Sequence, residues 1–248
     1  MIKFFRKIRQ NLLMENKTGK YFKYAIGEIV LVVIGILIAL QINNWNEDRK
    51  NQIEEKAILS KFKQDLKSDS IYYQVNLKQI ISIDSLHREL FLVGFNQKAT
   101  IDHTKPSYIR RSLVYSPVAR ENDPNITNKI NDEKIREEIK IYFRSMSEVY
   151  GANEEFEKVI FEIRAFLRQN KSHNVKSWFN SEMLLTLGSE VDEIITETNL
   201  IDLAKNEDFQ QLVFESSLKI NETKQRLTKL IDENSMLIAK VDKYLNRE

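Results

Sequence analysis

The sequence predicts an all-α fold in which a single N-terminal transmembrane helix precedes an elongated antiparallel helical bundle. Three observations support this prediction. An apolar run lies near the N-terminus, apolar residues recur at steps of three and four in three later segments, and the 248 residues include only six Gly and three Pro. So few turn-forming residues disfavour a turn-rich β architecture and a Gly-rich phosphate-binding loop. Helices are therefore the expected elements throughout.

The transmembrane helix is predicted at residues 24–42, YAIGEIVLVVIGILIALQI, where Ile29 to Leu40 includes no polar side chain. A helix from Tyr24 to Trp45 would extend about 31 Å, and a bilayer's hydrocarbon core is about 30 Å thick. Tyr24 and Trp45 mark the two ends, as interfacial aromatic residues do. The segment is thus long and apolar enough to cross a membrane.

Two features inside this segment leave alternatives open. Glu28 lies one turn from the N-terminal edge, where a carboxyl near the lipid headgroups is favoured over a functional membrane carboxylate. Gly35 and Ala39 place two small residues on one face, where a second helix could approach for dimerisation, but small residues are also common in membrane spans.

No small-residue cleavage site follows the apolar run, so the anchor is expected to stay uncleaved.

The charge on either side of the apolar run predicts the orientation of the protein in the membrane. Residues 1–23 hold seven Lys/Arg and one acid, whereas residues 43–248 have a net charge of −3. The positive-inside rule therefore predicts an inner-membrane protein with a cytoplasmic tail and a periplasmic domain at 43–248. In the tail, Lys3, Arg6 and Lys7 lie opposite an apolar arc, which is typical of a helix resting on anionic lipid.

Three long helices are predicted in the 43–248 domain. The first continues to Gly94, the second is centred on a ten-residue apolar series, and the third covers about Asp208 to Leu245. Short helices are expected near Trp178–Leu187 and Glu190–Ala204, after a turn at Asn170–Asn174. The expected core positions are Leu59, Phe62, Leu66, Tyr73, Ile80, Ile83, His87 and Leu90; Ile135, Ile139, Tyr142, Met146, Val149, Asn153, Phe156, Ile160, Ile163 and Leu167; and Val213, Ile220, Leu227, Ile231, Asn234, Ile238, Val241 and Leu245.

All three prolines fall between residues 106 and 124, which predicts a break between helices at about 95–128 with a short helical piece at Tyr108 to Val114. This connection is locally basic. Arg110 and Arg111 are candidates for binding an anion or an acidic partner, although a solvated loop is the favoured interpretation.

The sequence predicts no catalytic, cofactor-binding or metal-binding residue. It has no Cys, its three His are far apart, and it contains no nucleotide-binding or hydrolase motif. His87 lies on a core stripe, so a satisfied buried histidine is favoured over a metal ligand. Asn234, on the core row of the last helix, is expected either to fix the register of an oligomer or to mark a hydrated patch. The net charge of +2 disfavours nucleic-acid binding.

The N-terminal run, above all YAIGEIVLVVIGILIALQINNWNE, resembles an uncharacterised family of Bacteroidota, domain of unknown function 6090. The resemblance implies a single-span envelope protein of about this size, and it brings no assigned activity, cofactor or catalytic residue.

The function predicted from these features is that of a bitopic membrane protein with an interaction, scaffold or sensory module and no enzymatic activity. Its expected partners are the lipid bilayer and either another protein or a second copy of the chain. Two alternatives stay open: a membrane-tethered enzyme that uses carboxylates or a metal on the bundle, and a receptor domain for a small ligand.

Overall fold

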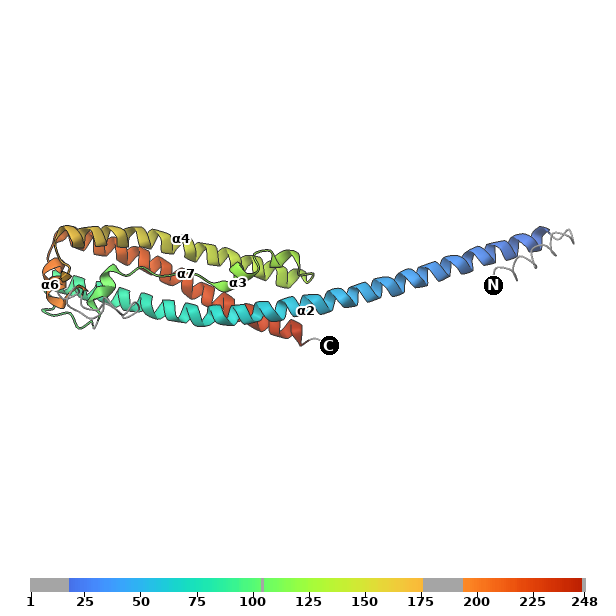
Figure 1. The fold of residues 1–248 in the computed structure, drawn as a ribbon, viewed down its shortest axis with the longest axis horizontal. Coiled ribbons are helices and arrows are strands. Elements are labelled where there is room, and N and C mark those ends of the chain that lie inside the picture. The colour runs from blue at the N-terminus through green and yellow to red at the C-terminus, as the bar shows by residue number, and fades with distance from the viewer. Residues whose placement is uncertain (1–17, 104, 176–193, 247–248) are drawn as a thin grey trace. The chain divides into compact units, whose positions relative to one another are not determined.

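The computed structural model describes residues 18–103, 105–175 and 194–246, without the side chains of 18–21 and 24. In these residues all regular structure is helical, which confirms the all-α prediction. The elements are α2 (Thr18–Gly94), η1 (Pro106–Arg110), α3 (Val118–Asn122), η2 (Ile126–Asn128), α4 (Glu133–Gln169), α6 (Glu197–Ala204) and α7 (Glu207–Leu245) (Figure 1). The chain divides into two compact units, Met1–Ala57 and Ile58–Glu248.

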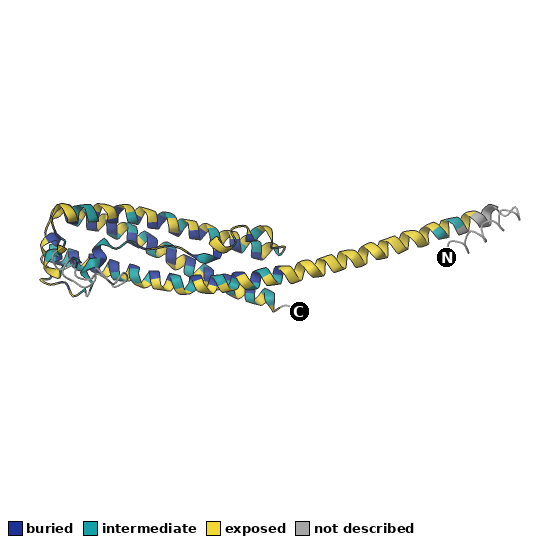
Figure 2. Cartoon of the chain, in the orientation of Figure 1, coloured by how far each residue is buried: buried dark blue, intermediate teal, exposed yellow. Residues whose placement is uncertain are grey.

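In the first unit, the described residues belong to α2 and include the apolar segment. One window of 18 residues has a mean hydropathy of 2.6, and none of its residues is buried (Figure 2). By length and composition this helix can cross a membrane, as is expected of a bitopic membrane protein. Ile29, Val33 and Leu37 are each about half exposed or more, so no other described part of the chain covers them.

The core of the second unit lies between α4, α7 and the C-terminal half of α2. The predicted stripes of α2 and α4 are buried throughout, because apolar residues spaced by three and four share one face of a helix. Side-chain caps fix where two of the helices begin. Asp132 accepts a hydrogen bond from the Ile135 backbone N–H, and Asn206 accepts one from the Phe209 N–H.

Ion pairs between the long helices show their directions. Lys63 Nζ, near the start of the α2 stripe, lies 2.5 Å from Asp242 Oδ1, near the end of α7. Lys224 Nζ of α7 lies 3.0 Å from Asp84 Oδ2 of α2. Helix α7 is therefore antiparallel to α2. It is also antiparallel to α4, since Lys240 pairs with Glu138 and Phe209 stacks on Phe166. Helices α2 and α4 consequently run in the same direction.

Two successive helices can run the same way only if the chain between them returns along the bundle. Residues 95–132, here called the return segment, do so between α2 and α4 (Figure 1). The segment first contacts α2 near the C-terminal end of that helix, where His103 Nε2 lies 3.0 Å from Ser82 Oγ. It contacts α2 again near Asp65, whose Oδ1 accepts a hydrogen bond from Asn122 Nδ2. Its described buried side chains are Ile101, Tyr108, Ile109, Leu113, Pro117, Ala119, Ile126 and Ile130.

The return segment corrects two predictions. It is not a solvated loop, because its apolar side chains are part of the buried core of the bundle. A helical piece at Tyr108–Val114 is also wrong in its bounds, since the 3-10 helix ends at Arg110 and residues 111–117 have no helical structure. Side chains of α4 satisfy the backbone there: Arg164 donates to the Arg110 carbonyl at 2.8 Å, and Asn153 to the Leu113 carbonyl at 3.4 Å.

Further differences concern α6 and α7. Helix α6 begins at Glu197, capped by Thr196, rather than at Glu190. The predicted helix at Trp178–Leu187 lies outside the described residues. In α7 the row from Val213 to Val241 is buried as predicted, but the second fully buried row is not the one with Ile231, Ile238 and Leu245, which are only partly buried. The second row consists of Phe209, Ser216, Thr223, Leu230 and Leu237.

Candidate functional site

Four buried polar side chains meet inside the bundle and are here called the polar cluster: Asp69 and Tyr73 on α2, Tyr142 on α4, and Asn234 on α7. The Tyr73 and Tyr142 hydroxyls lie 2.9 Å apart. Asn234 Nδ2 donates to Tyr142 Oη at 3.0 Å and to the Leu66 carbonyl at 3.1 Å. The cluster therefore joins all three long helices at one level, and the Tyr142 hydroxyl is bonded to each of the other three members.

Asp69 also holds the return segment. Its Oδ1 accepts a hydrogen bond from the Val118 backbone N–H at 2.7 Å, and its Oδ2 accepts one from the Ala119 N–H at 3.1 Å. The Tyr142 hydroxyl donates to Oδ2 at 3.4 Å. Burial raises the pKa of Asp69, while these hydrogen bonds oppose the rise. Neutral dipoles rather than a cation thus surround this carboxyl group.

Tyr115 of the return segment extends the cluster outward. Its ring stacks on Tyr73, with centroids 6.2 Å apart and planes 15° apart. Burial raises the pKa values of Tyr73, Tyr115 and Tyr142, so all three keep their protons at neutral pH. The Tyr115 hydroxyl is buried.

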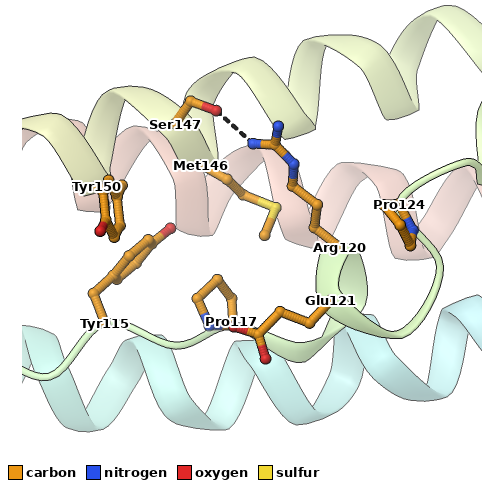
Figure 3. A pocket seen from close by; sticks show the side chains of 8 residues that line it. All are labelled: Tyr115, Pro117, Arg120, Glu121, Pro124, Met146, Ser147 and Tyr150. Carbon is orange, nitrogen blue, oxygen red and sulfur yellow. Dashed lines mark hydrogen bonds between the residues drawn. The ribbon is translucent and has the colours of Figure 1, made fainter.

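Tyr115 borders a pocket of about 380 Å³ between the return segment and α4, here called the proline pocket (Figure 3). Arg120 reaches across to α4, where its Nη1 donates to Ser147 Oγ at 2.6 Å. Its guanidinium also lies 5.8 Å from the centre of the Phe143 ring. The walls are largely apolar, with a guanidinium and a carboxylate among them. The lining residues are Tyr115, Pro117, Arg120, Glu121, Pro124, Met146, Ser147 and Tyr150.

This arrangement is suited to binding a ligand. A pocket with apolar walls and one charged group of each sign can hold a small, partly apolar molecule or a side chain of another protein. Tyr115 contacts both the pocket and the polar cluster, so an occupant of the pocket would touch the group that joins the bundle's elements.

His87 is buried elsewhere in the bundle. Its Nε2 lies 3.3 Å from Ser216 Oγ, and its Nδ1 lies 3.2 Å from Ser217 Oγ. Burial lowers the pKa of His87 to about 4, partly offset by the Asp84 carboxylate. The prediction of a satisfied core histidine is confirmed. Across the described ranges, no group of three or more His, Asp or Glu is arranged to hold a metal ion.

The structure separates the candidate residues of the sequence. Asn234 lies in the polar cluster, bonded to α2 and α4 of its own chain and completely buried, so it fixes contacts within the bundle. Arg110 borders a second pocket, while Arg111 lies 4.9 Å from the Tyr108 ring. Lys3, Arg6 and Lys7 lie outside the described residues.

The anchor residues are exposed where they can be described. Trp45 is 65% exposed, and Ala39 is also exposed. A Cβ added at Gly35 would meet no atom within 4 Å, so this face is open to a second helix. Glu28 is partly exposed, and the side chain of Tyr24 is not described.

Sequence reasoning missed Asp69, the residue that joins the cluster to the return segment. A signal was present, because the companion row of Phe62, Ile83 and Leu90 has Asp69 and Asn76 at its two intermediate positions. Both are buried. A polar residue on a core row requires a buried partner. The partners of Asp69 are the backbone N–H groups of Val118 and Ala119, which lie 49 and 50 residues further along the chain.

Comparison with known proteins found one family that is similar to part of the chain. The model of the family of unknown function DUF6090 matches residues 28–93, about a quarter of the chain. The resemblance is thus confirmed, and the matched region is the apolar segment together with the α2 stripe that enters the bundle. No curated protein and no solved structure matches the chain.

Proposed function

We propose that this chain is a bitopic inner-membrane protein whose basic tail is cytoplasmic and whose helical bundle is a periplasmic interaction or sensory module. The observation that carries the proposal is the apolar segment of α2, which is long enough to cross a bilayer and has no buried residue in its most apolar window. A soluble protein rarely leaves so large an apolar surface exposed to water. A lipid bilayer would cover it completely.

The charge distribution supports the orientation. The net charge changes from +6 in residues 1–23 to −3 in residues 43–248, and basic segments are retained on the cytoplasmic side of membrane spans.

The proline pocket favours a sensory role over a purely structural one. Tyr115 lines this pocket, and the same ring stacks on Tyr73 of the polar cluster. A ligand that repositions Tyr115 would change contacts among α2, α4 and α7. A partner protein that inserts a side chain into the pocket would have the same effect.

Topology is the first test. A reporter active on one side of the membrane only, fused after Glu248, should be active in the periplasm, and a reporter at Met1 should be active in the cytoplasm. The anchor should stay uncleaved and resist alkaline extraction. A cytoplasmic C-terminus would overturn the proposal.

The interaction role is tested separately by site-specific photocrosslinking in native membranes. A photoreactive amino acid at Tyr150, which is 52% exposed and borders the proline pocket, should give a crosslinked product with a partner or a second copy. The matched control is Ile141, 45% exposed on the same helix and outside the described pockets. Absence of any crosslink from Tyr150 under all growth conditions would exclude a stable partner there.

A further inference from the structure

A second pocket, of about 610 Å³, lies where α4 ends and is here called the arginine pocket. It is bordered by Arg164 and Arg168 on α4, Arg110 at the end of η1, and His173 after the α4 turn. The other lining residues are Phe161, Ala165, Asn174, Val175 and Ile194. Among the described residues, no carboxylate lines this pocket.

Arg164 is held rigidly at the wall. Its Nε donates to the Arg110 carbonyl at 2.8 Å, and its Nη2 lies 3.2 Å from Ser112 Oγ. Its guanidinium also lies 5.3 Å from the centre of the Phe161 ring. A guanidinium positioned in this way needs no rearrangement to receive a ligand, which reduces the entropic cost of binding.

Two ring or guanidinium nitrogens at the pocket lack partners. Arg110 Nε and His173 Nε2 are both buried and make no hydrogen bond with any described group. Burial lowers the pKa of Arg110, and the charge of Arg164 lowers it further. Burial also lowers the pKa of His173, as does the nearby Arg110. A buried donor without an acceptor costs free energy, which an acceptor in the pocket would recover.

Stabilisation of the α4 dipole explains only part of this arrangement. Arg168 is in the last turn of α4, where a cation is favourable. Arg164 lies one turn earlier on the same face, where a like charge four residues away is unfavourable. Arg110 belongs to another element altogether. Three arginines from two elements thus line one cavity, where an anion would offset their like charges.

We infer that the arginine pocket binds a small organic anion, with its carboxylate or phosphate group on Arg110, Arg164 and Arg168 and its apolar body against Phe161, Val175 and Ile194. Arginine forks match the oxygens of both groups. The apolar part of the lining favours a substituted anion over a bare inorganic ion. The site is separate from the proline pocket and does not depend on the role proposed for it.

The test uses full-length protein in phosphatidylcholine nanodiscs, titrated calorimetrically with benzoate and with phenyl phosphate at constant ionic strength. Saturable one-to-one binding of at least one of these anions is expected, with no binding of neutral benzamide. Arg110→Gln and Arg168→Gln should each weaken it about tenfold, as loss of a charge-assisted hydrogen bond does. Arg110→Lys, which keeps the charge, should weaken it less.

Arg144→Gln is the matched control, since Arg144 is an exposed arginine on α4 outside the pocket. It should leave the affinity within about twofold. The result that overturns the inference is no saturable binding of either anion, or equal weakening by Arg144→Gln and Arg110→Gln. Nanodiscs with phosphatidylglycerol distinguish the source of the anion: competition with phenyl phosphate would identify a lipid headgroup, and its absence a free ligand.

Discussion

Helix α2 includes two segments that differ in burial, here called the first segment (Ile29 to Ile42) and the bundle segment (Leu59 to Val93). From Ile29 to Ile42 its apolar side chains are exposed around the whole circumference, whereas from Leu59 to Val93 one stripe is buried and the rest is solvated. A helix that is apolar on all sides needs an apolar solvent, while a helix with one apolar stripe needs other helices. The first segment of this helix is thus suited to a lipid bilayer, and the bundle segment is suited to a protein core.

The largest difference should come from charges placed on exposed apolar positions of the two segments. Val33→Arg combined with Ile36→Arg puts two cations near the middle of the span, at a cost of about 6 kcal/mol for insertion. The variant should leave the membrane fraction, as measured by alkaline extraction and immunoblotting.

The matched control is Ile71→Arg combined with Val75→Arg, at positions 71% and 59% exposed in the bundle segment. These charges should be solvated, so membrane association and folding should both be unchanged. If the control variant also left the membrane or failed to fold, the exposed face of the bundle segment would be covered in the native protein, and the contrast between the segments would be wrong.

The second largest effect is expected in the polar cluster of the bundle segment. The described residues of the first segment include no such buried polar group. Asp69→Ala leaves the backbone N–H groups of Val118 and Ala119 buried without their acceptor. The free energy of unfolding should fall by about 3 kcal/mol, measured by denaturant titration of the full chain in detergent micelles.

Asp65→Ala serves as its control. Asp65 lies one turn earlier on α2 and accepts a hydrogen bond from Asn122 at 2.9 Å, but it is only half-buried. Its loss should cost less than about 1 kcal/mol, because water can replace an exposed partner. Equal losses for the two variants would show that Asp69 does not anchor the return segment.

His87 predicts a pH dependence of the bundle. Its pKa is about 4 when folded and 6.5 in its ordinary state, so protons bind the unfolded chain more tightly. Its contribution to the free energy of unfolding is therefore fully present above pH 6.5 and falls as the pH drops toward 4. Between pH 7 and pH 5 the loss should be about 2 kcal/mol.

His87→Gln isolates this contribution from those of other titrating groups. Asp69, with its raised pKa, acts in the opposite direction, because protonation is easier in the folded chain than in the unfolded one. The difference between wild type and His87→Gln at each pH removes the Asp69 contribution. A difference that does not change between pH 7 and pH 5 would contradict the burial of a neutral imidazole.

The bundle segment also shows which features a single sequence can predict. Rows of apolar residues predicted the core of α2 and α4, because residues spaced by three and four share one face of a helix. The position of Gly94 predicted the end of α2, because glycine favours helix ends. The path of the return segment did not follow from any local pattern. Its backbone is held by side chains distant in sequence, such as Arg164 for Arg110 and Asp69 for Val118.

The arginine pocket was only partly predictable for the same reason. Arg110 stood out because the connection is locally basic, but Arg164 and Arg168 fall on a long amphipathic helix, where single cations are normally solvated. Only the direction of the return segment brings Arg110 to the C-terminal end of α4. A local sequence pattern therefore identifies one member of the pocket and does not identify its companions.

Glycine substitutions give the smallest contrast between the two segments. A Cβ at Gly94 would lie 2.4 Å from the Ala204 carbonyl oxygen and 2.8 Å from Gln210 Nε2, whereas a Cβ at Gly35 would meet nothing within 4 Å. Gln210 Nε2 already donates to that same carbonyl at 2.8 Å. Gly94→Ala must therefore move backbone and disturb the junction of α6 and α7, with an expected loss of about 1.5 kcal/mol in the free energy of unfolding.

Gly35→Ala should leave the free energy of unfolding of the bundle unchanged within about 0.5 kcal/mol, because no described atom contacts the added methyl group. A loss at Gly35 that appears only at high protein-to-lipid ratio would mean that a second helix packs against this face. Crosslinking of single-cysteine variants at Ala39, one turn further along the same face, would then report the approach of two chains. With no such dependence, the first segment of α2 meets lipid alone on its Gly35 face.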